Sequence, residues 1–168
     1  MRGLVNCGNT CYFSTAIQCL AHVPPLSKHL FLDDYEGKCK ITKEYEKVAR
    51  QLFLSGETSP VNPSALLSEF RSKFPSFTGN QQHDAQEVIV HMIDVLENSL
   101  GKELIQNIFN GTEVQETVYP GGVSRKEETF TTMILEPISN SKLESILEQR
   151  WKHTGIEGYT DDSGKKHN

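Results

Sequence analysis

Cysteine residues gather near the start of the chain, in a stretch rich in glycine, asparagine and threonine. Residues 3–20 read GLVNCGNTCYFSTAIQCL, and Cys11 stands where this polar loop gives way to a helix-like apolar pattern. A thiol in the first turn of a helix lies close to unpaired N–H groups and to the positive end of the helix dipole. Both favour the thiolate, the nucleophilic form of cysteine. The stretch therefore indicates a nucleophile, although small core cysteines are the competing interpretation.

The residues around Cys11 support this chemistry. Asn6 carries a carboxamide that can donate a hydrogen bond to a developing oxyanion. Gly8 permits a tight turn of the backbone, and Asn9 or Thr10 is expected to cap the following helix with its side chain. A thiol beside an amide donor suits acyl transfer through a thioester.

The other three cysteines are expected to have no chemical role. Cys7 lies inside the loop, Cys19 is predicted to be a core residue of the helix, and Cys39 is predicted to lie on the surface between lysines. The sequence contains no C-x-x-C pair, so it predicts no metal site. Because no signal peptide is visible, we expect reduced thiols in a cytoplasmic or nuclear protein.

A second polar cluster precedes the strongest helical pattern of the chain. Residues 79–88 read GNQQHDAQEV. Taken alone, Asp84 is a favourable residue for a helix N-terminus, and Glu87 three positions later completes a capping-box pattern. On the residues alone, a structural role is the better interpretation of this cluster.

The composition describes an ordinary globular chain or a piece of a larger one. The 168 residues are 36% hydrophobic and 23% charged, and the formal net charge is −5. An acidic balance argues against nucleic acid or an anionic membrane as the main partner. No apolar run is long enough to span a bilayer.

Hydrophobic periodicity predicts a mostly helical chain with a few strands towards its C-terminus. Pro24-Pro25 is expected to stop the first helix, and Pro120-Gly121-Gly122 is expected to turn a hairpin. Ser141 is expected to cap a last helix, whose apolar face would be Leu143, Ile146, Leu147 and Trp151. The helices are predicted at residues 11–22, 43–54, 62–70, 84–100 and 103–109, with a loop at 75–80, strands around 114–118 and 129–135, and a patternless tail at 155–168.

The first motif resembles the cysteine box of the ubiquitin-specific proteases, which are papain-like cysteine deubiquitinases. That box reads Gly-Leu-x-Asn-x-Gly-Asn-Thr-Cys-Tyr, followed by a glutamine in the same helix. The residues on this pattern are Gly3, Leu4, Asn6, Gly8, Asn9, Thr10, Cys11, Tyr12 and Gln18. Phe13, Ser14 and Thr15 depart from the Met-Asn-Ser that the family often has.

The second motif resembles another box of the same family, Gln-Gln/His-Asp-Ala-x-Glu, over residues 82–87. Residues 108–111 and 128–135 resemble the elements that follow it, so the resemblance covers essentially the whole chain. It implies an α+β, papain-like peptidase fold. Residues 1–168 would be the N-terminal part of a single catalytic domain, with the helical thumb at about 1–110 and the start of the fingers and palm at about 111–168.

The resemblance also implies a function. The protein would hydrolyse the peptide or isopeptide bond after the C-terminal glycine of ubiquitin, without a cofactor or metal. Cys11 would be the nucleophile and Asn6 the oxyanion donor. Gln82, Asp84 and Glu87 would bind the basic tail of ubiquitin, so the partners would be ubiquitin and ubiquitinated proteins. His83 would belong to this binding helix, and His22, His29 and His91 are expected to be surface or packing residues.

The resemblance leaves the general base unassigned. The family takes its catalytic histidine from a later box that ends in Gly-His-Tyr, and residues 152–159 contain only Gly158-Tyr159 without that histidine. The catalytic His and its Asp or Asn partner are therefore expected outside this chain. The cysteine pairs that hold zinc in the fingers of many members are also absent around Thr117 to Gly121. The alternative is a truncated, inactive protein that binds ubiquitin.

Overall fold

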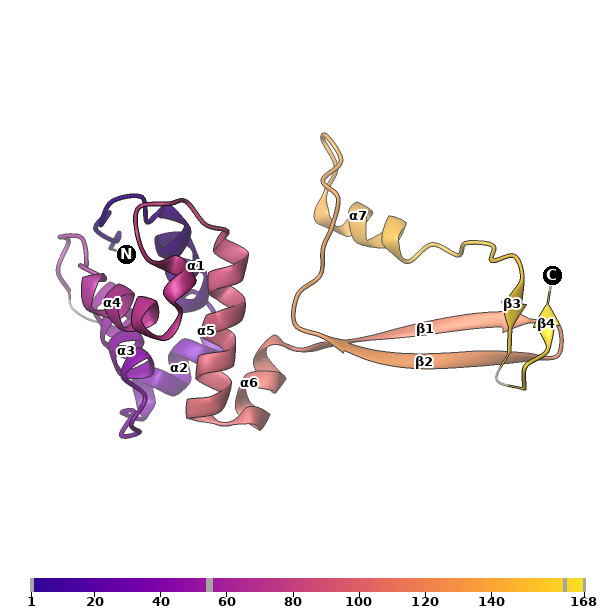
Figure 1. Ribbon diagram of the computed structural model, residues 1–168, viewed down its shortest axis with the longest axis horizontal. Helices are drawn as coiled ribbons and strands as arrows, with labels where there is room; N and C mark the ends of the chain where they lie inside the picture. The colour runs from indigo at the N-terminus through magenta and orange to yellow at the C-terminus, as the bar shows by residue number, and fades with distance from the viewer. Residues whose placement is uncertain (1, 54–55, 162, 168) are drawn as a thin grey trace. The chain divides into compact units, whose positions relative to one another are not determined.

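The computed structural model describes residues 2–53, 56–161 and 163–167. The chain divides into two compact units, one up to residue 108 and one from residue 109 onward. The first unit is helical, and the second contains a long β-hairpin (Figure 1). None of the helices within the described residues combines the length and the apolar composition that crossing a membrane requires.

The first unit is a cluster of helices in which α1 packs against α5, and α3 packs against α2, α4 and α5 (Figure 1). The helices are α1 (Cys11–Ala21), α2 (Pro24–Leu32), α3 (Lys40–Phe53), α4 (Ser64–Lys73), α5 (Ala85–Leu100) and α6 (Lys102–Phe109), with a short 3₁₀ turn η1 (Pro75–Phe77) inside the predicted loop.

Helix α2 was not predicted, and the reason lies in Pro24. The two prolines do follow the end of α1, but they also open the next helix, because proline at a first helical position needs no N–H partner and has a suitable φ. Helix α3 begins three residues before the predicted start at Lys43. Its predicted end at Leu54 lies outside the described residues.

The predicted helix starts at Asn62 and Asp84 are nearly correct. The Asn62 side chain accepts a hydrogen bond from the Ser64 N–H at 3.0 Å, although Pro63 is the capping residue of α4. Asp84 is the N-cap of α5, where its carboxylate accepts from the Gln86 N–H at 2.8 Å. Short polar side chains at these positions satisfy N–H groups that have no partner inside the helix.

Phe70 lies at the centre of the apolar core of the first unit. Its ring centroid is 5.4 Å from that of Phe13, 4.8 Å from Phe74 and 5.1 Å from Phe77. Other large side chains that are completely or almost completely buried come from helices α1 to α6: Ile17, Leu20, Leu26, Leu30, Tyr45, Leu66, Met92, Leu96 and Ile105. This core fixes α1, α4 and α5 against one another.

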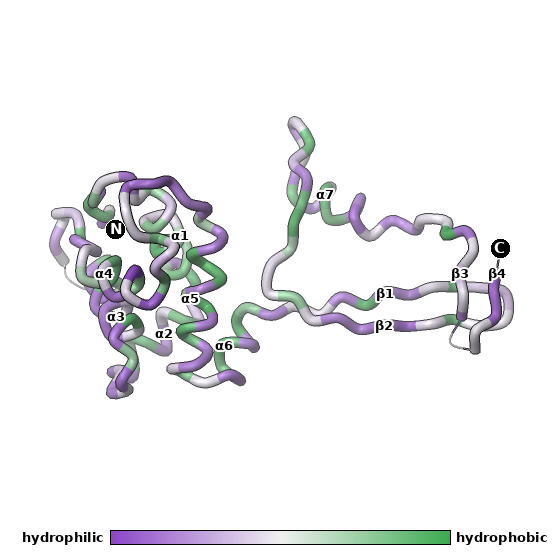
Figure 2. The backbone as a smooth tube through the Cα atoms, in the orientation of Figure 1, coloured by the Kyte–Doolittle hydropathy of each residue, from purple (hydrophilic) through white to green (hydrophobic). Residues whose placement is uncertain are grey.

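The second unit contains β1 (Gly111–Tyr119) and β2 (Gly122–Phe130), which pair antiparallel with Tyr119 opposite Gly122. The predicted turn is therefore confirmed, and Gly121 adopts a φ of 107° there. The second strand was predicted at 129–135, which is wrong, since the tight turn starts the pairing at Gly122. The first strand was predicted around 114–118, inside β1, whereas no apolar pattern marked β2; both strands are coloured mainly hydrophilic or neutral in Figure 2.

The end of the second unit contains α7 (Leu143–Arg150) and a small hairpin of β3 (Tyr159–Thr160) and β4 (Lys166–His167). The predicted cap at Ser141 is wrong, because Lys142 is the N-cap and makes no side-chain capping bond. Of the predicted apolar face, Leu143 and Trp151 are exposed, and Ile146 and Leu147 are half-buried. The predicted patternless tail contains the β3–β4 hairpin.

Asp161 organises the β3–β4 hairpin. Its carboxylate accepts hydrogen bonds from the hydroxyl and N–H of Ser163 and from the N–H of Lys165, and it lies 2.8 Å from the His167 ring. The Ser163 hydroxyl, and after it His167, hold the pKa of the Asp161 carboxyl group well below its ordinary value. The tail therefore folds around one carboxylate.

Replacing Phe70 with alanine is expected to lower the free energy of unfolding of the helical unit by about 3–5 kcal/mol, since it leaves a cavity among three other rings. Urea unfolding followed by helical circular dichroism measures this change. The control is Leu32→Ala, which removes a side chain that is 71% exposed and is expected to change stability by less than about 0.5 kcal/mol. Equal losses in the two variants would contradict the assigned core.

Acid is expected to open the β3–β4 hairpin. The folded-state pKa of Asp161 lies below its unfolded-state value, so Asp161 stabilises the hairpin at higher pH, and this contribution is lost as pH falls below about 4. The amide chemical shifts of Thr160 and Lys166 during a pH titration report the opening. Asp161→Asn is expected to remove this pH dependence; an unchanged titration curve would show that another group is responsible.

Candidate active site

The thiol of Cys11 is exposed at the first residue of α1, where unpaired helical N–H groups point. Cys7 and Cys39 are half-buried, and all four cysteines are free thiols. The prediction that Cys19 belongs to the core is wrong, because Cys19 lies on the solvent side of α1 and is exposed. Exposure alone therefore does not single out Cys11; its place at the helix N-terminus does.

The loop before Cys11 is held by the side chain of Thr10. Thr10 is the N-cap residue of α1, but its hydroxyl makes no capping bond, so the predicted side-chain cap is wrong. The hydroxyl instead accepts from the Cys7 N–H at 3.1 Å and donates to Oδ1 of Asn6 at 3.2 Å. Gly8 adopts a φ of 108°, which favours glycine, and this closes the turn.

Asn6 is exposed, with its carboxamide oxygen engaged by Thr10. Its NH₂ group is therefore the end of the carboxamide that remains to donate to a ligand. The structure places Asn6 in the tight loop that leads into α1, and Cys11 is the first residue of that helix.

The second motif lies against the first. The side-chain amide of Asn9 donates to the carbonyl of Asn80 at 2.8 Å, which joins the two loops. The ring centroid of Tyr12, the residue after the nucleophile, is 5.1 Å from that of His83. The structure thus brings together two polar motifs about seventy residues apart in the sequence, and nothing in the residues alone predicts this.

His83 precedes α5 and is a packing residue. Its ring lies 4.9 Å from that of Phe77 as well as against Tyr12. Its Nε2 atom is buried and has no hydrogen-bond partner within the described part of the chain. These two ring contacts and the buried Nε2 atom agree with the prediction that His83 is a packing residue.

Gln82, Asp84 and Glu87 are all exposed. Two of them, Asp84 and Glu87, line a hollow of about 500 Å³ on the N-terminal half of α5. Its remaining lining residues are Ser76, Phe77, Gln86, Val90 and His91. Gln82 lies in the loop before this hollow and does not line it. The hollow combines two carboxylates with an apolar floor, which suits a basic ligand with apolar neighbours.

Phe77 and His91 line this hollow although neither was predicted from the sequence as a site residue. His91 lies four residues after Glu87, so helical spacing places it on the same face of α5, and that signal was present in the sequence. The His91 ring stacks on Phe74 with centroids 4.3 Å apart. Phe77 carried no such signal, because it comes from η1.

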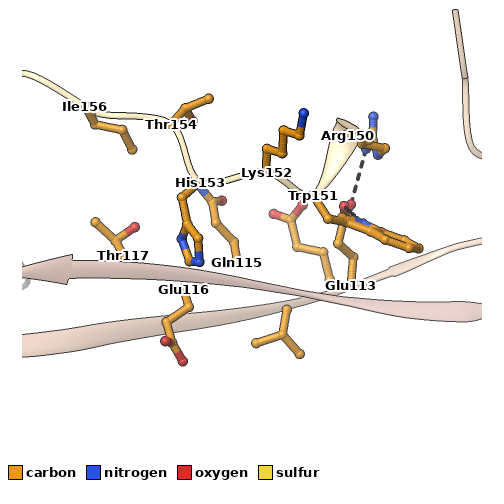
Figure 3. A pocket seen from close by; sticks show the side chains of 12 residues that line it. Glu113, Gln115, Glu116, Thr117, Arg150, Trp151, Lys152, His153, Thr154 and Ile156 are labelled. Carbon is orange, nitrogen blue, oxygen red and sulfur yellow. Dashed lines mark hydrogen bonds and ion pairs between the residues drawn. The ribbon is translucent and has the colours of Figure 1, made fainter. Parts of the chain in front are cut away.

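The second unit has a hollow of about 430 Å³ between β1 and the end of α7 (Figure 3). Glu113 joins its walls: the Trp151 indole donates to one carboxylate oxygen at 3.1 Å, and Arg150 lies 3.3 Å from the other. His153 also lines it. None of the predicted site residues lies here. Within the described residues, no group of three or more His, Cys, Asp or Glu side chains is placed to hold a metal ion.

Comparisons with known proteins agree on one family. A family model described as ubiquitin carboxyl-terminal hydrolase matches residues 2–148. The chain is 34% identical over 110 residues to ubiquitin carboxyl-terminal hydrolase 15 of Homo sapiens, and 36% identical over 112 residues to ubiquitin carboxyl-terminal hydrolase 9 of Arabidopsis thaliana. These matches cover 60% and 61% of this chain, but only 11% and 12% of the relatives.

Solved structures share the fold. A chain in the structure of the SAGA Ubp8/Sgf11/Sus1/Sgf73 DUB module bound to ubiquitin aldehyde superposes with a TM-score of 0.77 at 20% identity, covering 99% of this chain and 42% of that one. The corresponding structure bound to monoubiquitin gives a TM-score of 0.78 at 19% identity, covering 100% of this chain and 43% of that one. The predicted α+β fold class is confirmed.

Proposed function

The chain belongs to the ubiquitin carboxyl-terminal hydrolase family, and we propose that the whole protein is a thiol-dependent, ubiquitin-specific peptidase. It hydrolyses the peptide or isopeptide bond after the C-terminal glycine of ubiquitin. The observation that carries this proposal is the exposed thiol of Cys11 at the N-terminus of α1, preceded by the loop in which the Asn6 carboxamide is held by Thr10.

In the proposed reaction, the Cys11 thiolate attacks the carbonyl carbon of the C-terminal glycine of ubiquitin. The carbonyl oxygen takes the negative charge, and the NH₂ group of Asn6 donates to it. Collapse of the tetrahedral intermediate expels the amine and leaves a thioester, which water then hydrolyses. A base must take the thiol proton and return it to the amine. That base is expected to be the family's later histidine, which no residue of this chain matches.

The tail of ubiquitin is proposed to bind beside α5. Asp84 and Glu87 line a hollow of about 500 Å³ that also contains Phe77 and Val90, and Gln82 lies just before it. Within the described residues, neither carboxylate has a cationic side chain within ion-pair distance, so both remain available to a basic ligand. The hydrogen bond between Asn9 and Asn80 holds this region next to the loop of Cys11.

The domain organisation and location are part of the same proposal. The chain spans about a ninth of the length of the curated relatives it matches and less than half of the solved chains it resembles. We assign residues 1–168 to the N-terminal part of one catalytic domain, with a thumb at about 1–110 and the start of the fingers and palm at about 111–168. The free cysteines suit a reducing compartment, the cytoplasm or nucleus.

A second candidate function is a catalytically inactive ubiquitin-binding protein. The observation behind it is that no residue of this sequence matches the family's catalytic histidine. The two functions differ in whether a ubiquitin amide is turned over, so one measurement separates them.

Cys11→Ala is expected to reduce hydrolysis of a fluorogenic ubiquitin C-terminal amide by the whole protein more than about 10⁴-fold, because it removes the nucleophile. The control is Cys19→Ala, which removes another exposed thiol from α1 and should leave the rate unchanged. Turnover that survives in Cys11→Ala would refute the assigned nucleophile. A protein that binds ubiquitin but turns over no substrate in its unaltered form would be the inactive binder.

Asp84→Asn is expected to raise KM for the ubiquitin amide about fivefold without changing stability. Asparagine caps a helix as well as aspartate does, so this change removes only the charge. Asp84→Ala also loses the cap and is expected to lower the free energy of unfolding by about 1 kcal/mol. Steady-state kinetics and thermal unfolding measure the two effects. An unchanged KM in Asp84→Asn would argue against tail binding at this carboxylate.

A further inference from the structure

We infer that Thr10 is a positioning residue, whose hydroxyl fixes the carboxamide of Asn6 with its NH₂ group towards the reacting carbonyl. This inference rests on the proposed function for its consequence in catalysis. It rests on the hydrogen bonds of the loop for its geometry.

The orientation of the Asn6 carboxamide follows from the hydrogen-bonding capacity of one hydroxyl. A threonine hydroxyl has one proton to donate and can accept two hydrogen bonds. The Cys7 N–H can only donate, and it lies 3.1 Å from Oγ1 of Thr10, so it occupies an acceptor position. The proton of the hydroxyl then needs an acceptor of its own.

Burial of Thr10 limits where that proton can go. Thr10 is 2% exposed, so water is a poor acceptor for its hydroxyl. The Asn6 carboxamide lies 3.2 Å away, and its oxygen accepts the proton. If the carboxamide were turned by 180°, its NH₂ group would face the hydroxyl, and the buried hydroxyl proton would lose this acceptor. Leaving a buried donor unpaired is unfavourable, so the loop selects one orientation.

The capping geometry is an independent sign of this role. Threonine at an N-cap ordinarily accepts a hydrogen bond from the second or third N–H of its helix. Thr10 makes no such bond in α1, and its hydroxyl turns back towards the loop instead. The Thr10 hydroxyl therefore does not cap α1 and instead donates its hydrogen bond to Asn6.

Thr10 also couples Asn6 to the nucleophile. Its carbonyl accepts from the Ser14 N–H at 2.9 Å, which begins the helix that carries Cys11. Its own N–H donates to the Gly8 carbonyl at 2.8 Å and closes the loop. One residue thus holds the amide through its side chain and the start of α1 through its backbone. A preorganised donor needs no reorientation when the oxyanion forms, and this lowers the barrier.

The test compares Thr10→Val with Thr10→Ser in the whole protein. Valine keeps the shape of threonine and loses the hydroxyl, whereas serine keeps the hydroxyl. We expect kcat for a ubiquitin amide to fall between about 10-fold and about 100-fold in Thr10→Val, with KM unchanged, and to stay within about threefold in Thr10→Ser. Adding Thr10→Val to Asn6→Ala should cost nothing further, because the two residues act as one unit.

A second readout does not depend on activity. In the chain labelled with ¹⁵N-asparagine, the Asn6 side-chain NH₂ signals are identified by their loss in Asn6→Ala. A high heteronuclear NOE is expected for this group in the unaltered chain and in Thr10→Ser, and a low one in Thr10→Val, whose fold is checked by circular dichroism. The inference is overturned if the Asn6 side-chain NH₂ group is equally rigid in Thr10→Val. It is also overturned if Thr10→Val slows the Asn6→Ala protein by the same factor as it slows the unaltered protein.

The two readouts separate this inference from the proposed function. One possible result is that neither the unaltered protein nor any variant cleaves a ubiquitin amide, but the Asn6 NOE still falls in Thr10→Val. The proposed function then fails, and the positioning of Asn6 by Thr10 stands. If the protein is active and Thr10→Val leaves kcat unchanged, the deubiquitinase function stands and the role of Thr10 is wrong.

Discussion

Two backbone hydrogen bonds to Val61 hold the segment on which the candidate site depends. Val5 donates to the Val61 carbonyl, and Val61 donates to the Gly3 carbonyl, both at 2.8 Å. Arg2 anchors the same segment, since its guanidinium is buried, donates to Ser59 and to the Gln51 carbonyl, and pairs with Glu57. Asn6 follows directly, so this short parallel pairing holds the start of the loop that leads to Cys11.

The site also depends on the packing of α1 against α5, which aligns two polar loops. Each loop has backbone groups that no regular element satisfies, and the loops partly satisfy one another through Asn9 and Asn80. The buried rings of Tyr12 and Phe77 contact each other, and each also contacts the ring of His83. Cys11 on α1 and the acidic hollow on α5 are both exposed, but the two helices pack on the same apolar core. That shared core holds the two sites in fixed positions relative to each other.

The sequence predictions are accurate in the part of the chain that has a buried core and poor in the part that has none. In the helical unit, Ile17, Leu20, Val88 and Met92 recur at helical spacing because they face a buried centre, and α1 and α5 were predicted to within one or two residues. From residue 109 onward no described residue is fully buried. There β2 is stabilised by its turn and by cross-strand pairs such as Arg125 with Glu116, so no apolar pattern marked its ends.

The sequence by itself determined the helices of the first unit other than α2, the turn at Gly121, the cap at Asp84 and the two motifs that carry Cys11 and Asp84. These features depend on local spacing and on residue type, which any reader of the chain can see. Only the tertiary structure decided that the motifs are adjacent, that Cys19 is exposed, and that the Thr10 hydroxyl binds Asn6 instead of capping α1. A polar side chain has several possible partners, and packing chooses among them by deciding which partners come within reach and which lose contact with water.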